Sequence, residues 1–201
     1  MGSAVLAGQM LVAQEVSGLG TASPTPLGGE YRIDNWTTEE GLPENSVSFI
    51  TQTLDGYLWV ATGDGLARFD GVRFTVFNRG NTPALTRRRF SRLLPDHQGG
   101  VWVLSDDGAL FRWHTGRFHA YTEEDGLPAN GCSAMQEDAT GALWVTSAAG
   151  GRCFTFVRDR FVFAADVSNL TRGNVWQLER DASGTLWGLA TGDLIATFGR
   201  F

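Results

Sequence analysis

Three consecutive arginines, Arg87, Arg88 and Arg89, form a candidate anion-binding cluster. Each guanidinium is planar and can donate two parallel hydrogen bonds to a carboxylate or sulfate group. The cluster therefore predicts binding of an acidic sugar. The residues alone leave a second interpretation open, in which these side chains are solvated or form ion pairs with neighbouring Asp or Glu residues.

Two asparagines, Asn45 and Asn130, occupy matching positions in two similar segments, Gly41-Leu-Pro-Glu-Asn45 and Gly126-Leu-Pro-Ala-Asn130. An amide side chain both donates and accepts hydrogen bonds, so both residues are candidate ligand contacts. The arginine cluster replaces the Glu44-Asn45-Ser46 stretch in the next copy of a repeat described below. All these candidates are therefore expected on equivalent loops.

The sequence offers no catalytic constellation. Acidic runs at Glu39-Glu40 and Glu123–Asp125 could by chance supply the two carboxylates ~5–9 Å apart that a glycosidase needs, but their place in repeated loops favours solvated turn residues. His97, His114 and His119 are expected in or beside turns, His97 in a solvated one. No GxSxG or HExxH motif is present, so the sequence predicts a protein that is not an enzyme and has no cofactor.

The two cysteines, Cys132 and Cys153, match no metal-binding motif, because no CxxC or Cys/His cluster accompanies them. No metal site is therefore predicted. The sequence leaves open whether the two residues form a disulfide, as an exported chain would allow, or remain buried thiols.

The composition limits the kinds of partner that the chain could bind. A net charge of −6 and a pI near 5.0 argue against a nucleic-acid-binding surface and against electrostatic binding to anionic lipid. No apolar stretch approaches the ~20 residues needed to span a bilayer. Residues 1–30 are predicted to be a leader and linker. The apolar run Ala4–Ala13 fits either the remainder of a signal peptide or an unstructured leader.

An internal repeat organises the rest of the chain. Four tryptophans are separated by 43, 42 and 43 residues, each three residues after a glycine, and phenylalanines recur in step with them. The repeated residues are Trp59, Trp102, Trp144 and Trp187; Gly56, Gly99, Gly141 and Gly184; and Phe74, Phe118 and Phe161. A period of about 40–50 residues is typical of propeller blades or of paired-helix repeats.

The local pattern favours propeller blades. Short runs rich in β-branched and aromatic residues alternate with Gly-containing turns, and none has the 3.6-residue period of a helix. We therefore predict an all-β fold, a β-propeller with four consecutive four-stranded antiparallel blades at about 45–78, 88–122, 130–165 and 173–201. An outer strand at 31–36 precedes them. A tryptophan in each blade is expected to fill the layer between blades.

The segments that carry the repeat resemble a known family. Trp36-Thr-Thr-Glu-Glu-Gly-Leu-Pro-Glu-Asn-Ser-Val47 and Asp55-Gly-Tyr-Leu-Trp-Val-Ala-Thr62 are similar to the linker and the core of two-component regulator propeller repeats. The resemblance covers Tyr31–Phe201. The third copy departs from the pattern at Gly151-Arg-Cys-Phe154, and the second lacks Gly-Leu-Pro and carries the three arginines instead.

The resemblance implies a sensing role. Such repeats form rings, usually of seven blades, in the periplasmic part of bacterial inner-membrane regulators. A stalk, a membrane helix and a histidine kinase or diguanylate cyclase output normally follow, and some members sense polysaccharide fragments. We therefore expect a fragment of a ligand-sensing propeller in a phosphorelay regulator. Its expected partners are an oligosaccharide or other small ligand, the remaining blades and output domains, and a second copy in a homodimer. A polysaccharide-acting enzyme and a protein-binding scaffold are the alternatives.

Overall fold

The computed structural model describes residues 34–168, 173–190 and 195–198. Contacts divide the chain into a unit at Met1–Asp34 and a unit at Asn35–Phe201, and the description below concerns the second unit. The predicted leader at 1–30 lies outside the described residues. No helix among the described residues is long and apolar enough to cross a membrane.

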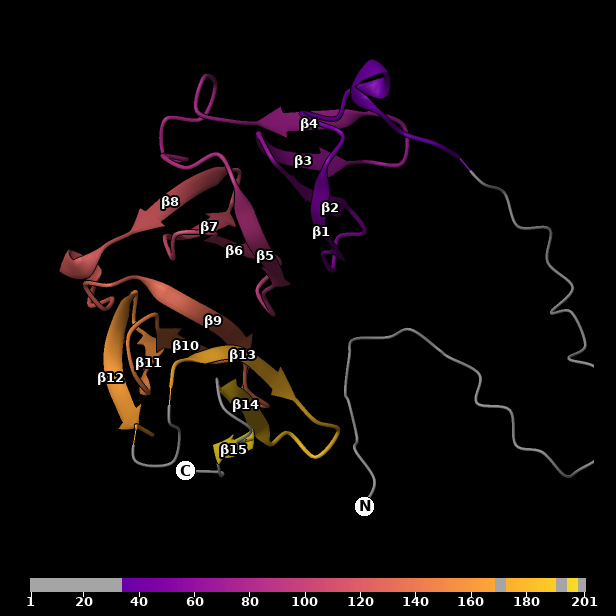
Figure 1. Ribbon diagram of the computed structural model, residues 1–201. Helices are drawn as coiled ribbons and strands as arrows, with labels where there is room; N and C mark the ends of the chain where they lie inside the picture. The colour runs from indigo at the N-terminus through magenta and orange to yellow at the C-terminus, as the bar shows by residue number, and fades with distance from the viewer. Residues whose placement is uncertain (1–33, 169–172, 191–194, 199–201) are drawn as a thin grey trace, which may run out of the picture. The chain divides into compact units, whose positions relative to one another are not determined.

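Four antiparallel sheets follow one another along the chain, each built from consecutive strands in up-and-down order (Figure 1). The first sheet contains β1 (Val47–Gln52), β2 (Leu58–Thr62), β3 (Gly65–Phe69) and β4 (Phe74–Phe77). The second contains β5 (Phe90–Pro95), β6 (Val101–Ser105), β7 (Leu110–His114) and β8 (Arg117–Tyr121). The third contains β9 (Cys132–Glu137), β10 (Leu143–Ser147), β11 (Arg152–Val157) and β12 (Arg160–Asp166).

The fourth sheet has three strands within the described residues: β13 (Val175–Arg180), β14 (Leu186–Ala190) and β15 (Ile195–Phe198). Its expected outer strand falls on residues 199–201, which lie outside the described part of the chain. Two short 3-10 helices, η1 (Thr38–Glu40) and η2 (Glu123–Asp125), precede the first and third sheets. The prediction of an all-β chain built from four consecutive antiparallel sheets is confirmed.

Only residues 34–36 of the expected outer strand at 31–36 are described, and they are not assigned to a strand. The ring of Trp36 packs against Phe69 of β3, with centroids 4.9 Å apart, and against Phe74 of β4 at 6.2 Å. Trp36 thereby covers part of one face of the first sheet.

A carboxylate organises the hairpin between the first two strands of three sheets. Asp96, Asp138 and Asp181 each accept hydrogen bonds from the backbone N–H groups two and four residues later, at 2.7–3.1 Å. Gly99 then turns the chain with φ +83°, a conformation that favours glycine. In the first sheet Thr53 takes the place of these aspartates, and Asp55 accepts the hydrogen bond of the Thr53 hydroxyl at 2.6 Å.

The predicted tryptophan layer is present, but burial differs among its members. Trp59 and Trp102 are 1% and 2% exposed. Trp59 contacts Trp113 and Phe118 of the second sheet, and Trp102 contacts Phe156 of the third. Such contacts bury aromatic area between neighbouring sheets. Trp144 is half-buried and Trp187 is 38% exposed. Among the repeated phenylalanines, Phe161 is buried, while Phe74 and Phe118 are half-buried.

The first strand of every sheet carries a β-bulge at the same place. The register shifts at the residues Ser48, Ser91, Ser133 and Trp176. A bulge redirects one side chain out of the regular alternation. The Ser48 hydroxyl donates to the Phe90 carbonyl of β5 at 2.7 Å, and the Ser133 hydroxyl donates to the Val175 carbonyl of β13. Ser48 and Ser133 therefore fasten adjacent sheets to one another, whereas the Ser91 hydroxyl donates to the Leu104 carbonyl of its own sheet.

Candidate functional site

The arginine cluster lies on the β4–β5 connection, beside a hollow of about 180 Å³. The hollow is lined by Asp64, Asn78, Arg79, Gly80, Arg87 and Arg88. Arg89 is exposed and does not belong to the lining. The structure thus brings two of the three predicted arginines to one hollow.

Both of these arginines have acidic partners. Arg87 Nε lies 2.5 Å from Asp107 Oδ2, within the second sheet, and Arg88 Nε lies 3.5 Å from Asp64 Oδ1 of the first. Burial raises the pKa of the Asp107 carboxyl, but a hydrogen bond from Ser105 and the charge of Arg87 outweigh it, so the pKa is lowered overall. These pairs match the ion-pair interpretation that the sequence left open. An anionic ligand would have to compete with both aspartates.

The two candidate asparagines do not line this hollow. Asn45 and Asn130 are both exposed. Asn45 Oδ1 accepts a hydrogen bond from the backbone N–H of Thr38 at 2.9 Å, so it supports the start of η1. Asn130 remains a prediction from the repeat pattern alone.

The acidic runs of the linkers cap the two 3-10 helices. The Glu40 carboxylate accepts from the Thr37 N–H at 2.6 Å, and the Asp125 carboxylate accepts from the Thr122 N–H at 2.8 Å. Each forms a capping box with the threonine before the helix. Hydrogen bonds from Thr37 lower the pKa of Glu40. These carboxylates therefore have a local structural role as helix caps, which the sequence analysis did not predict.

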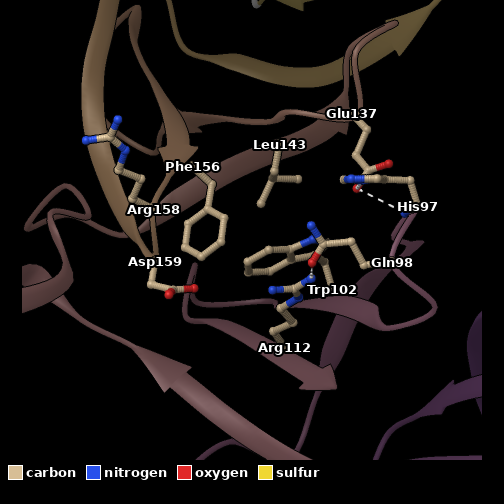
Figure 2. Close-up of a pocket in the computed structure, with 10 residues that line it drawn as sticks. His97, Gln98, Trp102, Arg112, Glu137, Leu143, Phe156, Arg158 and Asp159 are labelled. Carbon is tan, nitrogen blue, oxygen red and sulfur yellow. Dashed lines mark hydrogen bonds and ion pairs between the residues drawn. The ribbon is translucent and has the colours of Figure 1, made fainter. Parts of the chain in front are cut away.

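A second pocket, which the sequence did not reveal, lies between the second and third sheets (Figure 2). Its volume is about 220 Å³. Apolar and aromatic side chains from β6, β10 and β11 meet polar side chains from β7, β9 and two hairpin turns. The lining residues are His97, Gln98, Trp102, Arg112, Glu137, Gly141, Leu143, Phe156, Arg158 and Asp159.

Arg112 is fixed in this pocket by its neighbours. Its guanidinium hydrogen-bonds the buried Asp96 carboxylate at 2.7–2.8 Å and donates to Gln98 at 2.8 Å. It also lies 4.9 Å from the ring of Trp102 and 5.9 Å from that of Phe156. A guanidinium held between a carboxylate and aromatic rings is rigid and has its charge compensated.

Beside Gln98, His97 and Glu137 connect the two sheets (Figure 2). His97 Nδ1 lies 3.2 Å from Glu137 Oε1, and the His97 backbone N–H lies 3.4 Å from the same oxygen. The Glu137 side chain is 12% exposed, and burial raises its pKa. His97 is half-exposed, which agrees with its predicted turn position.

The repeat itself contained a signal for this pocket. Glu137 comes 40 residues after His97, which is close to one repeat of the blade pattern, so the two residues lie on adjacent sheets. Asp159 stands in the hairpin position that Gly116 fills in the sheet before. Reading the departures between copies, in addition to the shared positions, would have drawn attention to both.

Cys132 and Cys153 are free and buried. Burial raises the pKa of each thiol to about 12. Among the described residues, no group of three or more His, Cys, Asp or Glu side chains is arranged to hold a metal ion. The burial and raised pKa of both thiols give no support for a nucleophilic or metal-binding role of either cysteine.

Comparison with known proteins finds similar folds among solved structures. No protein-family model and no curated protein matches the sequence. The extracellular domain of a putative hybrid two-component system from B. thetaiotaomicron matches with a TM-score of 0.64 and 18% identity, over 78% of this chain and 22% of that one. Virginiamycin B lyase from Staphylococcus aureus matches with a TM-score of 0.56 and 16% identity, over 76% of this chain and 55% of that one.

A third similar structure is the β-propeller domain of Cps50 from Myceliophteria thermophila, with a TM-score of 0.51 and 11% identity, over 72% of this chain and 48% of that one. The four sheets are β-propeller blades. The inner strand of each blade is the bulged strand, and the pocket of Figure 2 lies between the second and third blades. The chain spans about a fifth of the length of the two-component extracellular domain.

Proposed function

We propose that this chain is part of the ligand-sensing propeller of a bacterial two-component regulator and does not itself catalyse a reaction. The observation that carries the proposal is the blade repeat. Its linker and core sequences resemble two-component regulator propellers, and its fold is similar to an extracellular domain of such a system. Pockets at blade junctions give such a propeller places to bind small molecules.

The proposal includes a location and partners. An extracellular sensor domain works outside the inner membrane, so we place this chain in the periplasm. Its ligand would be an oligosaccharide or another small molecule, with an acidic sugar as the first candidate at Arg87–Arg89. Its protein partners would be further blades, a stalk and output domains, and a second copy of the same chain.

The virginiamycin B lyase match supports an enzyme as the second candidate function, because that protein is a catalyst with a similar fold. A protein-binding scaffold is the third. Only the enzyme would change a bound small molecule chemically. Binding and turnover therefore separate the first two functions.

The test uses the full chain immobilised at low density, with oligogalacturonate as the acidic probe and a neutral maltooligosaccharide of the same length for comparison. We expect saturable binding of the acidic probe and recovery of the unchanged probe, checked by NMR after long incubation. Cleavage or elimination in the probe would support the enzyme. Absence of binding to both probes would contradict the acidic-sugar ligand.

A further inference from the structure

The pocket between the second and third blades has a carboxylate at each of two walls. Glu137 ends β9 and reaches in from one side, while Asp159 lies at the β11–β12 turn on another side (Figure 2). The rings of Phe156 and Trp102 and the side chain of Leu143 form the wall between them. The pocket therefore combines an apolar surface with two carboxylate groups.

The positive groups near the pocket do not neutralise these two carboxylates. Arg112 is already bonded to Asp96 and Gln98. The guanidinium of Arg158 points away from the other labelled side chains in Figure 2. His97 contacts Glu137 but carries a positive charge only when it is protonated. The carboxylates of Glu137 and Asp159 are therefore the groups of the lining with which a cation would pair.

The backbone at Asp159 gives a second, independent observation. The β11–β12 hairpin has two residues at positive φ, Arg158 at +49° and Asp159 at +64°. The β7–β8 hairpin has the same form, with Thr115 at +49° and Gly116 at +84°. An aspartate in this conformation is less stable than a glycine. The strained position thus holds a carboxylate at the pocket where the preceding blade has no side chain.

We propose that this pocket binds a small organic cation, such as a primary or quaternary amine, between Glu137 and Asp159 and beside the ring of Phe156. Carboxylates attract the charge directly, and aromatic rings attract a cation through their quadrupole. A volume of about 220 Å³ is smaller than the usual pocket for a drug-sized ligand, so the ligand has a compact head group.

This site is separate from the arginine cluster and has the opposite charge preference. It also does not depend on the sensing function, since binding can be measured in the chain itself. An anion would be repelled by Glu137 and Asp159. A neutral molecule of the same shape would gain only the apolar contacts with Leu143 and Phe156.

The probe is choline chloride, titrated into the full chain at low micromolar concentration and followed by tryptophan fluorescence. The neutral comparison is 3,3-dimethyl-1-butanol, which has the same shape without the charge. We expect saturable binding of choline and affinity for the neutral compound weaker by about tenfold or more. Equal affinity for the two compounds, or no choline binding up to about 50 mM, would overturn the proposal.

Three variants assign the site. D159G takes the residue of the equivalent turn in the preceding blade, so its fold is expected to be preserved, and E137Q keeps the shape of the side chain. Each should weaken choline binding by about tenfold. D106N removes an exposed carboxylate outside the pocket lining and should leave the affinity unchanged. Unchanged affinity in D159G and E137Q, with urea unfolding curves like the parent chain's, would refute the assignment.

Discussion

Arg68 lacks the carboxylate that its counterpart Arg112 has, and supplying it should stabilise the first blade. Arg68 pairs in register with Trp59 as Arg112 does with Trp102. It stacks on Tyr57, Trp59 and Trp113 at 4.3–5.9 Å, but its buried Nε has no hydrogen-bond partner within the described structure. Asp96 provides that partner to Arg112 at 2.8 Å.

The double variant T53D/D55Q copies the second blade. Thr53 occupies the place of Asp96 in the turn and is similarly buried, and Asp55 occupies the place of Gln98. A buried donor without a partner costs about 1–3 kcal/mol, and hydrogen bonds to charged groups are worth about 1.5–3 kcal/mol. Desolvation of the new carboxylate offsets part of that gain. We expect a net increase of about 1–2 kcal/mol in the free energy of unfolding.

Urea denaturation of the two chains measures this difference, and a thermal melt should shift upward by about 2–4 °C per kcal/mol. T53N/D55Q is the matched control, because its amide has the shape of the carboxylate without the charge, and it should gain less. The reciprocal variant D96T should lose about 3 kcal/mol by leaving Arg112 unpaired. A double variant that is no more stable than the parent chain, or a control that gains as much, would refute the reasoning.

Four further predictions test the remaining inferences. Replacing Arg87–Arg89 together by Gln should weaken oligogalacturonate binding by about tenfold or more, and unchanged affinity in a binding assay would remove the acidic-sugar hypothesis. Cys132 and Cys153 should both react with iodoacetamide in urea but only slowly in the folded chain, because they are buried and the pKa of each thiol is raised to about 12. Burial raises the pKa of Glu137 from 4.5 in the folded chain, so the stability of the parent chain relative to E137Q should fall as the pH rises above about 4.5, measured by urea denaturation at several pH values. Residues 31–201 alone should self-associate at micromolar concentration through uncovered blade surface, and a monodisperse product with a cooperative melt in light scattering and calorimetry would contradict this.

The repeat made the fold predictable because every blade needs the same few residues. The hairpin between the first two strands of each blade has a glycine such as Gly99 at positive φ, and each blade junction needs a large ring such as Trp102. These requirements recur at a fixed period, so a single sequence displays them four times. The bulge at Ser48 was not predicted, although a serine recurs at this place in the next two blades, because a register shift depends on pairing between strands, which the residue type alone does not show.

The candidate site was less predictable, because its charges depend on contacts between blades. The sequence shows Arg88 but does not show that Asp64, more than twenty residues earlier, lies within 3.5 Å of it. Likewise, the loop position of His97 predicts exposure but not its contact with Glu137. Side-chain partners across a blade junction follow from how adjacent sheets pack, and the hydrophobic pattern fixes that packing only coarsely.

Differences among the blades also explain why the four tryptophans differ. In the first two blades the third strand places an arginine opposite the tryptophan, and the indoles of Trp59 and Trp102 are buried beside these guanidiniums. In the third blade Thr155 occupies that register position, and the Trp144 indole N–H donates to the turn aspartate Asp138 at 2.9 Å. The same carboxylate position therefore serves either an arginine or an indole.

This alternation suggests how the propeller tolerates change at its binding surfaces. The turn carboxylate keeps the hairpin closed through one oxygen, as Asp96 does for the Gln98 and Gly100 N–H groups, and its second oxygen is free to pair with whichever side chain the third strand supplies. The hairpin turn and the contact with the third strand thus depend on different atoms of one residue. Substitutions such as glycine to Asp159 in the neighbouring turn can then alter a pocket without disturbing the blade that supports it.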